Sequence, residues 1–354
     1  MQRGIPFLFM RGGTSRGPYF ARADLPEDRD ALAEMLVRVV GSGHPLNIDG
    51  IGGGAAVTTK VAMLSRSETE GVDVDYFFAQ VGVEDRLVDF RPTCGNILAG
   101  VGPAAVEMGL VKAGDPETRV RIRAVNTEAR VDALVQTPGG RVAYEGGTEI
   151  AGVPGSAAPV ELAFSGVEGS VTGSLLPSGA RREEIGGLSV TCMDVAMPIV
   201  IARADAFGLT GYESAGDLDA NRPFMERMEA LRREAGRRMG MGDVSASVTP
   251  KFALLAPPRT GGAVTARYFM PKACHPSMAV TGAQCIASCV LMPGTVAEGI
   301  AAPPAGNPAV VTVEHPSGAL DVTVDHTSEG ESWRVNSAGV VRTARLLARG
   351  EVFA

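Results

Sequence analysis

The stretch Val88–Val111, VDFRPTCGNILAGVGPAAVEMGLV, decides the fold that we expect for the whole chain. A short strand-like segment leads to Cys94, and apolar residues then follow at roughly helical spacing until Gly109. Glu107 is the one charged residue of that run, so the predicted helix is apolar nearly all round, which is typical of a buried helix. Pro103 removes one backbone donor and is expected to bend it.

Cys94 is expected at or just before the N-terminus of this helix. Free backbone N–H groups and the positive end of the helix dipole favour a thiolate or a bound carboxylate there. The other interpretation is that Cys94 is a small core residue, as most free cysteines are. The spacing alone leaves both interpretations open.

The length and composition predict an ordinary globular protein of two domains. A chain of 354 residues is too long for one core, and a net charge of −7 does not suit a nucleic-acid binder. The five cysteines form no C-x-x-C pair, which favours a reduced, cytoplasmic protein. The N-terminus has no signal peptide pattern. The uncharged run 273–297 contains His, Ser, Gln and Pro, so it indicates a protein interior rather than a membrane span.

Both halves of the chain repeat one plan, in which strands accompany a single buried, small-residue helix. The second buried helix is predicted at about 282–292, and the two halves meet near Pro177-Ser178-Gly179. This pattern favours an α+β pseudo-repeat with a cleft between the halves. Two surface helices are also expected, one starting at Pro26 and ending at Gly41 and one over about 222–239. Short strands are expected at 86–90, 141–144 and 340–347, among others.

The glycine-rich passage around Gly53 invites two nucleotide-binding interpretations. Gly50-x-Gly52-x-x-Ala55 resembles a dinucleotide fingerprint, but neither a strand before it nor a helix after it is readable. A phosphate-binding loop needs Gly-Lys-Ser/Thr, which is absent here. The glycines can still let the backbone approach a ligand closely.

Lys60 begins an apolar segment, Val61-Ala62-Met63-Leu64, that is predicted to be a strand. Such a lysine can extend its ammonium to solvent. In a cleft, it could instead serve as a general base.

Further cationic and hydroxyl residues occur at loop positions. Collected at one cleft, they would bind a small acid with several negative charges. These residues are Arg11, Thr14, Ser15, Lys251, Arg267, Lys272, His275 and Ser277. Cys274 and His275 have no second cluster of ligands, so we predict no metal site. Cys285 and Cys289, on the second apolar helix, are expected to be core residues.

Several of these segments together resemble the PrpF-type isomerases of the diaminopimelate-epimerase-like fold. The segments are 11–17, 48–53, 59–62, 94–103, 274–275, 281–283, 314–318 and 341–345, in the family's order. The nearest branch is that of the 4-oxalomesaconate tautomerases or isomerases of gallate and protocatechuate degradation. Methylitaconate and aconitate isomerases are near relatives of that branch.

The resemblance implies two similar domains, each a β-barrel-like sheet wrapped around a central helix, with the active site in the interdomain cleft. We expect domains at 1–182 and 183–339, with 340–354 returning to the first. The resemblance also implies that the protein uses no cofactor and no metal and that its substrate is a di- or tricarboxylate. Lys60 and Cys94 would be catalytic, while Gly53, Gly95 and Asn96 would join the loop residues in binding substrate. The sequence leaves the oligomeric state open, and a homodimer is one state it allows.

Ala279 decides the expected class of reaction. Cofactor-independent racemases of this fold carry a cysteine at the start of each central helix, and matching Thr281-Gly282-Ala283 to their second motif leaves Ala279 where that cysteine would stand. One thiol and one lysine suit a proton shift along a conjugated acid better than stereoinversion. We therefore expect an isomerase or tautomerase for an unsaturated keto tricarboxylate such as 4-oxalomesaconate. The alternatives are an aconitate or methylitaconate isomerase, which makes an allylic shift, and a non-catalytic binder of small acids.

Overall fold

The computed structural model describes residues 3–330 and 332–354. The chain folds into two compact units, one reaching to Ala163 and including Val341–Ala354, the other formed by Phe164–Val340. The sequence predicted the boundary near 182, whereas the segment 164–182 packs with the second unit. Its backbone and hydroxyl groups donate to the buried Asp194 carboxylate, from Val171 N at 2.9 Å and from Ser170 Oγ at 3.0 Å.

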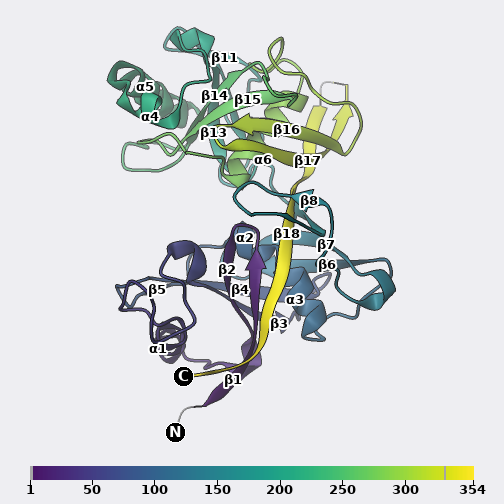
Figure 1. Cartoon of the computed structure of the whole chain (residues 1–354). Helices are drawn as coiled ribbons and strands as arrows, with labels where there is room; N and C mark the ends of the chain where they lie inside the picture. The colour runs from purple at the N-terminus through teal and green to yellow at the C-terminus, as the bar shows by residue number, and fades with distance from the viewer. Residues whose placement is uncertain (1–2, 331) are drawn as a thin grey trace. The chain divides into compact units, whose positions relative to one another are not determined.

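The first unit is a closed barrel (Figure 1). Within the described part of the chain its strand order is β1-β2-β3-β4-β6-β7-β10-β18, and β18 pairs back onto β1 in antiparallel fashion. The strands are β1 (Gly4–Gly12), β2 (Ser15–Ala21), β3 (Lys60–Arg66), β4 (Val74–Val81), β6 (Glu117–Ala124), β7 (Ala129–Gln136), β10 (Pro159–Ser165) and β18 (Ser332–Phe353). The chain's last segment was predicted as a short strand at 340–347, but β18 extends it in both directions. The C-terminal residues therefore close the first unit.

Two short helices, α2 (Gly95–Leu98) and α3 (Val101–Glu107), pack against the inner face of this barrel. The prediction of one continuous helix was wrong. Pro103 has no N–H to donate to the carbonyl of Ala99, four residues earlier, so the helix breaks between Leu98 and Val101. The expectation that this segment is buried is confirmed, because Ile97, Leu98 and Val101 are inaccessible to solvent or nearly so.

Helix α1 (Arg29–Val40) covers the outer face of the barrel. It begins three residues after the predicted start because the side chain of Asp28 caps it, accepting from Ala31 N at 2.9 Å. It ends, as predicted, at Gly41, whose φ of 78° suits a residue without Cβ. Val61 and Met63 of β3 belong to the apolar cluster beneath α1. Since side chains alternate along a strand, Lys60 and Ala62 point to the opposite, inner face.

The second unit is a sheet in the order β18-β17-β16-β15-β14-β13-β12-β11, with helix α6 (Val280–Leu291) packed against β12, β13, β16 and β17. Besides β18, the strands of this sheet are β11 (Glu183–Ile185), β12 (Leu188–Asp194), β13 (Pro198–Arg203), β14 (Lys251–Ala256), β15 (Val264–Phe269), β16 (Ala309–His315) and β17 (Gly318–Glu329). Helices α4 (Ala215–Ala220) and α5 (Arg222–Arg238) pack on the other face through Leu218, Phe224 and Met228.

The two units repeat the same strand directions. From β1 to β7 the successive pairings are antiparallel, parallel, antiparallel, parallel and antiparallel, and the pairings from β12 to β17 follow the same series. The outer helices lie between β2 and β3 in one unit and between β13 and β14 in the other, while the inner helices lie between β4 and β6 and between β15 and β16. The fold is therefore α+β and doubles one plan, as predicted.

Three small segments lie outside the strand orders of the two units. The strand predicted at 86–90 contains only β5 (Val88–Asp89), which pairs with β4. The segment 141–144 forms no strand; a separate ribbon of β8 (Thr148–Glu149) and β9 (Ser156–Ala157) lies shortly after it.

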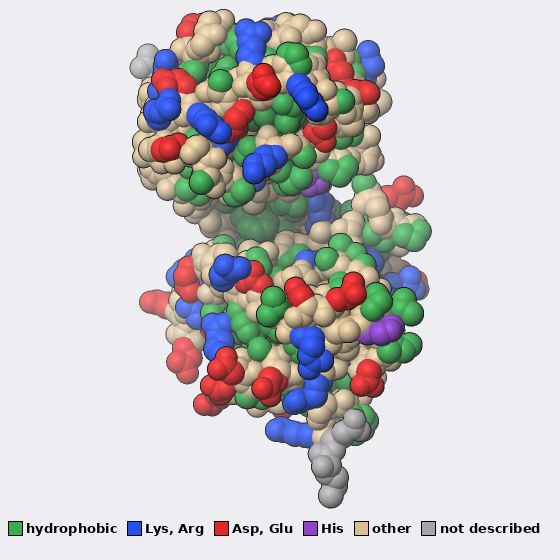
Figure 2. Space-filling view, turned by 90° about the vertical axis from the view of Figure 1, so that its left-hand side faces the viewer, with side chains coloured by type: hydrophobic (Ala, Val, Ile, Leu, Met, Phe, Trp, Pro, Cys, Tyr) green, Lys and Arg blue, Asp and Glu red, His purple; other side chains and the backbone are tan. Residues whose placement is uncertain are grey.

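The uncharged run 273–297 forms the loop before α6, the helix itself and the turn after it. Gln284 is fully buried in this helix, and its amide donates to Ala338 O at 2.8 Å. Across residues 3–330 and 332–354, no helix is both long and apolar enough to cross a membrane. On the face drawn in Figure 2, acidic and basic side chains are interspersed over each unit.

Candidate active site

Cys94 is the N-cap residue of α2, with an extended backbone, and it is half-buried. Its carbonyl accepts a long hydrogen bond from Tyr76 Oη at 3.4 Å. Tyr19 Oη donates to Ile97 O, at the other end of α2, at 2.5 Å. Burial, followed by an electrostatic contribution from Cys94, raises the pKa of both phenols well above the usual value. Both tyrosines therefore stay neutral donors that hold the turn carrying the thiol.

Lys60 is the first residue of β3 and points to the inner face of the barrel. Its Nζ donates to Gln80 Oε1 at 2.6 Å and lies 5.4 Å from the centroid of the Phe78 ring. The Phe78 and Tyr76 ring centroids are 6.3 Å apart, and Tyr76 reaches Cys94. A continuous set of inner-face side chains therefore connects the lysine with the cysteine in the first unit.

The loop between β1 and β2 contacts the same turn. Thr14 N donates to Asn96 Oδ1 at 3.3 Å, and a Cβ on Gly13, whose φ is +52°, would lie 2.1 Å from that oxygen. Arg11 connects the loop between β1 and β2 with β18, because its Nη1 donates to Gly13 O at 2.9 Å and to Thr343 O at 3.0 Å. Burial, followed by the charge of Arg345, lowers the pKa of Arg11.

Two features of this loop and turn are suited to a ligand. The Ser15 hydroxyl is buried, and within residues 3–330 and 332–354 it has no hydrogen-bond partner. A buried hydroxyl of this kind is costly unless it is satisfied, for example by a ligand oxygen. A Cβ built on Gly95 would meet no heavy atom within 4 Å, so the glycine leaves open space at the start of α2.

Gly53 lies apart from this turn, beside the Arg16 guanidinium. A Cβ there would come within 2.7 Å of Arg16 Nη2. Arg16 is exposed and was not among the residues predicted from the sequence, although it belongs to the same Arg11–Gly17 segment. It adds a cation close to a predicted binding residue of the first unit.

In the second unit, Lys251 and Ala279 occupy the places that correspond to Lys60 and Cys94. Lys251 is the first residue of β14, as Lys60 is of β3, and Ala279 is the N-cap residue of α6, as Cys94 is of α2. The prediction that alanine stands at the head of the second inner helix is confirmed. Burial, followed by the charge of Arg232, lowers the pKa of Lys251.

His275 and Ser277 lie together just before α6. Ser277 N donates to His275 Nδ1 at 2.9 Å, so this nitrogen is the acceptor and Nε2 carries the proton of the neutral ring. Burial lowers the pKa of His275, which favours that neutral form. The Ser277 hydroxyl also lies 3.5 Å from His315 Nδ1. The sequence offered no partner for His315, because 38 residues separate it from Ser277.

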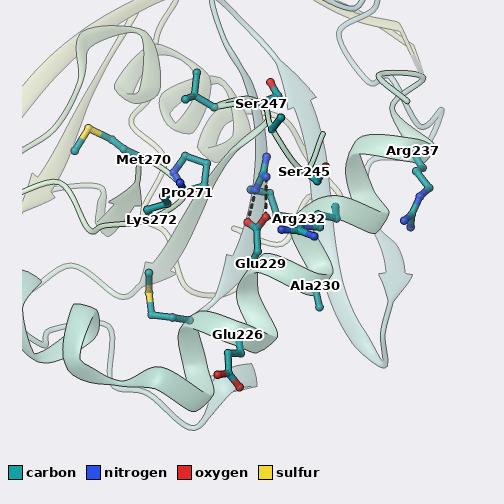
Figure 3. A pocket seen from close by; sticks show the side chains of 14 residues that line it. Glu226, Glu229, Ala230, Arg232, Arg237, Ser245, Ser247, Met270, Pro271 and Lys272 are labelled. Atoms are coloured by element: carbon teal, nitrogen blue, oxygen red, sulfur yellow. Dashed lines mark hydrogen bonds and ion pairs between the residues drawn. The ribbon is translucent and has the colours of Figure 1, made fainter. Parts of the chain in front are cut away.

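The structure does not bring Arg267 and Lys272 together with His275 and Ser277. Arg267 is buried on the face covered by α4 and α5, where its Nε donates to Glu213 O at 2.7 Å. Lys272 lines a separate pocket of about 860 Å³ between α5 and the loops 245–248 and 270–272 (Figure 3). The Arg232–Glu229 ion pair, with an Nε–Oε2 distance of 2.6 Å, lies in the wall of this pocket. Substrate binding by Arg267 and Lys272 stays a prediction.

The remaining thiols are buried, and the described residues contain no group of three or more potential metal ligands. Burial raises the pKa of Cys274 and of Cys289 to about 11, and that of Cys285 well above its usual value. Cys285 and Cys289 are completely inaccessible, as expected for core residues. Among the residues that the structure describes, Cys94 is thus the one cysteine that is not buried.

The model of the PrpF protein family matches residues 2–354. The chain belongs to the PrpF family. It is 46% identical over 348 residues to the (4E)-oxalomesaconate Delta-isomerase of Novosphingobium sp. (strain KA1), covering 98% of this chain and 97% of that one. It is 45% identical over 351 residues to the 4-oxalomesaconate tautomerase of Pseudomonas putida (strain KT2440), covering 99% and 96%. This PrpF protein is therefore an isomerase.

Solved structures agree with this assignment. The crystal structure of a methylitaconate-delta-isomerase superposes with a TM-score of 0.91 at 30% identity, over all of this chain and 96% of the other. A hydroxyproline epimerase from Agrobacterium vitis matches with a TM-score of 0.50 at 14% identity, over 100% and 94% of the two chains. The second likeness concerns the fold alone, and it confirms the epimerase-like architecture expected from the sequence.

Proposed function

We propose that this PrpF protein is a cofactor-independent isomerase that moves a proton along an unsaturated, keto-bearing tricarboxylate such as 4-oxalomesaconate. The observation that carries the proposal is that Lys60 and the turn bearing Cys94 belong to one barrel, where Phe78 and Tyr76 lie between them. The activities for which two relatives are named, each at least 45% identical over nearly the whole chain, support the choice of substrate.

In the proposed reaction, neutral Lys60 removes a proton from a carbon activated by a neighbouring keto or carboxylate group. The C–H electron pair enters the conjugated system as an enolate, and Lys60 becomes an ammonium ion. A proton then returns to another atom of the same system, and Cys94 is the proposed donor. The two transfers cancel in the substrate, so the product is its isomer and no oxidant or reductant is needed. The Lys60 ammonium then gives a proton to solvent and the Cys94 thiolate takes one from solvent, which restores the enzyme.

Several groups of the first unit can bind the negative charges of such a substrate. The exposed Arg16 guanidinium can pair with a carboxylate, and the Ser15 hydroxyl and the open space at Gly95 can receive another. Donors placed where charge develops stabilise the enolate more than the starting acid, which speeds the proton transfer. Asn96 Oδ1 already accepts from Thr14 N, so its remaining amide donor is the part available to a ligand.

An allylic isomerase of methylitaconate or aconitate type is the second candidate. It is favoured by the structural match of TM-score 0.91 to a methylitaconate-delta-isomerase. Both reactions would use the same two proton transfers. Their substrates differ, because one carries a keto group and the other does not. A binder of small acids without catalysis is the candidate from another class.

Proton NMR in deuterated water separates these functions. With 4-oxalomesaconate, we expect the protein to produce the isomer with deuterium at the carbon that receives the new proton. Turnover of methylitaconate or aconitate with none of the keto acid would favour the allylic reaction. Binding of the acids without deuterium incorporation or isomerisation would contradict an enzymatic role.

The number of carboxylates in the substrate should strongly affect the rate. A dicarboxylate that lacks one carboxylate of the tricarboxylate loses charge-assisted contacts, each worth roughly 1.5–3 kcal/mol. We therefore expect kcat/KM to fall by about 10- to 150-fold for each carboxylate removed. The measurement is a series of steady-state assays with matched di- and tricarboxylates, and equal kcat/KM values across the series would contradict the proposed substrate class.

A further inference from the structure

The Gln80 carboxamide is held in one orientation by its hydrogen-bond partners. The two N–H groups of its Nε2 are shared among three acceptors, Ala56 O at 3.1 Å and Thr59 Oγ1 and Val81 O at 3.2 Å each, while its Oε1 accepts from Lys60 Nζ at 2.6 Å. The Thr59 hydroxyl is buried and donates to Val81 O at 2.6 Å, so it can only accept from Gln80. Turning the amide over would point Oε1 at three acceptors and Nε2 at an ammonium ion. The surroundings of Gln80 therefore require its oxygen to face Lys60.

Gln80 gives Lys60 a fixed position without giving it a negative partner. In the described part of the chain, no carboxylate oxygen lies within 4.0 Å of the Lys60 nitrogen. The neighbouring carboxylate of Asp89, on β5 opposite Gln80, is bound by the Arg91 guanidinium at 2.9 Å. A carboxylate in place of the amide would stabilise the charged ammonium, and a charged ammonium cannot act as a base.

The second unit provides an internal comparison. The chain has four lysines, at 60, 112, 251 and 272, and two of them begin the corresponding strands β3 and β14. Gln80 lies opposite Lys60, whereas the pairing of β14 with β15 ends at Phe252 and Phe269, and Met270 beyond it lines the pocket beside α5. Within residues 3–330 and 332–354, Lys60 has a hydrogen bond to a side-chain amide and Lys251 has none.

We propose that Gln80 is the positioning residue of Lys60, an uncharged acceptor that aims the side-chain nitrogen while leaving it able to lose its proton. The inference rests on the proposed function, since it assigns Lys60 the role of base. Gln80 acts through Lys60 and needs no contact with the substrate.

Five other titratable or charged groups lie on the elements around Lys60 and Gln80. They are Arg16 and Tyr19 of β2, Tyr76 of β4, Asp89 of β5 and Cys94 at the head of α2. Both tyrosines are kept neutral by burial, and Asp89 is paired with Arg91. None of these residues has a hydrogen bond or ion pair to Lys60 Nζ within residues 3–330 and 332–354.

Two variants test the proposal, Gln80→Glu, which adds a charge, and Gln80→Met, which replaces the amide with a thioether, a weak acceptor. We expect the rising limb of the kcat–pH profile to move to higher pH by about one to three pH units in Gln80→Glu, because the carboxylate favours the ammonium form. In Gln80→Met we expect kcat to fall about 10-fold or more with a much smaller change in KM, since a misplaced base mainly affects the chemical step. Circular dichroism melts of both variants report whether they fold.

A direct measurement makes the test independent of turnover. Protein labelled with ¹³C at lysine Cε should give four resolvable signals, which single Lys→Arg variants assign. In Gln80→Glu we expect the Lys60 signal to titrate at higher pH than in the wild type, while the signal of the exposed Lys112 is unchanged. A Lys60 signal that titrates as in the wild type, with an unmoved kcat–pH profile, would overturn the proposal and leave Gln80 a packing residue. Absence of turnover in the wild type would instead refute the proposed function, and the Lys60 titration would still decide the role of Gln80.

Discussion

Lys60→Ala is expected to abolish isomerisation and deuterium incorporation while the protein remains folded. Removal of a general base typically costs about 10²- to 10⁴-fold in rate, and here the second proton transfer cannot occur until Lys60 has made the first. Lys60 contributes little to the core, because its neighbours Val61 and Met63 make the contacts beneath α1. The loss should therefore appear in kcat and not in the melting temperature. The assay is proton NMR of the keto tricarboxylate in deuterated water.

Lys112→Ala is the matched control, since Lys112 is exposed and belongs to none of the groups proposed to bind or react. It should retain wild-type activity, which excludes a general effect of removing a lysine. Near-normal turnover by a folded Lys60→Ala protein would show that the Lys60 ammonium extends to solvent and takes no part in the reaction. In that case the base would have to be sought elsewhere on the inner face.

Cys94→Ser is expected to lower kcat by about 10²-fold or more, because serine keeps the shape of the side chain but is far less acidic. Tyr76 and Tyr19 hold the backbone of this turn and not the thiol itself, so the substitution should leave the turn in position. Deuterium exchange at the carbon served by Lys60 should survive, since that transfer does not require the thiol. Separate measurement of exchange and of product formation distinguishes the two roles.

Alkylation provides independent evidence on Cys94. Iodoacetamide should modify Cys94 before Cys274 and Cys289, because those thiols are buried and their pKa values are raised to about 11. The keto tricarboxylate should protect Cys94 from modification, as followed by mass spectrometry of peptides. If Cys94 reacted no faster than the buried cysteines and Cys94→Ser retained full activity, the thiol would be a packing residue only.

Much of the architecture is predictable from the sequence, because it depends on local patterns. Apolar, small-residue runs indicate two buried helices, and Gly41 marks the end of α1 through its left-handed backbone. Pro103 predicts a disturbed helix, since a missing N–H is a local property, although the sequence does not show that the helix breaks into α2 and α3. The alanine at 279, where a racemase would need a thiol, already favours a proton shift over stereoinversion.

The tertiary structure alone decides how the predicted residues are grouped. Arg267 and Tyr268 are adjacent in the sequence, but strand alternation sends the arginine to the side of α4 and the tyrosine to the side of α6. His315 meets Ser277 only because β16 ends beside the loop before α6. Gln80 faces Lys60 because the register of β3 on β4 pairs residues 20 positions apart. Periodicity in a sequence reports which face of a strand a side chain occupies. The partner across the sheet depends on register and on long-range closure, which no local pattern encodes.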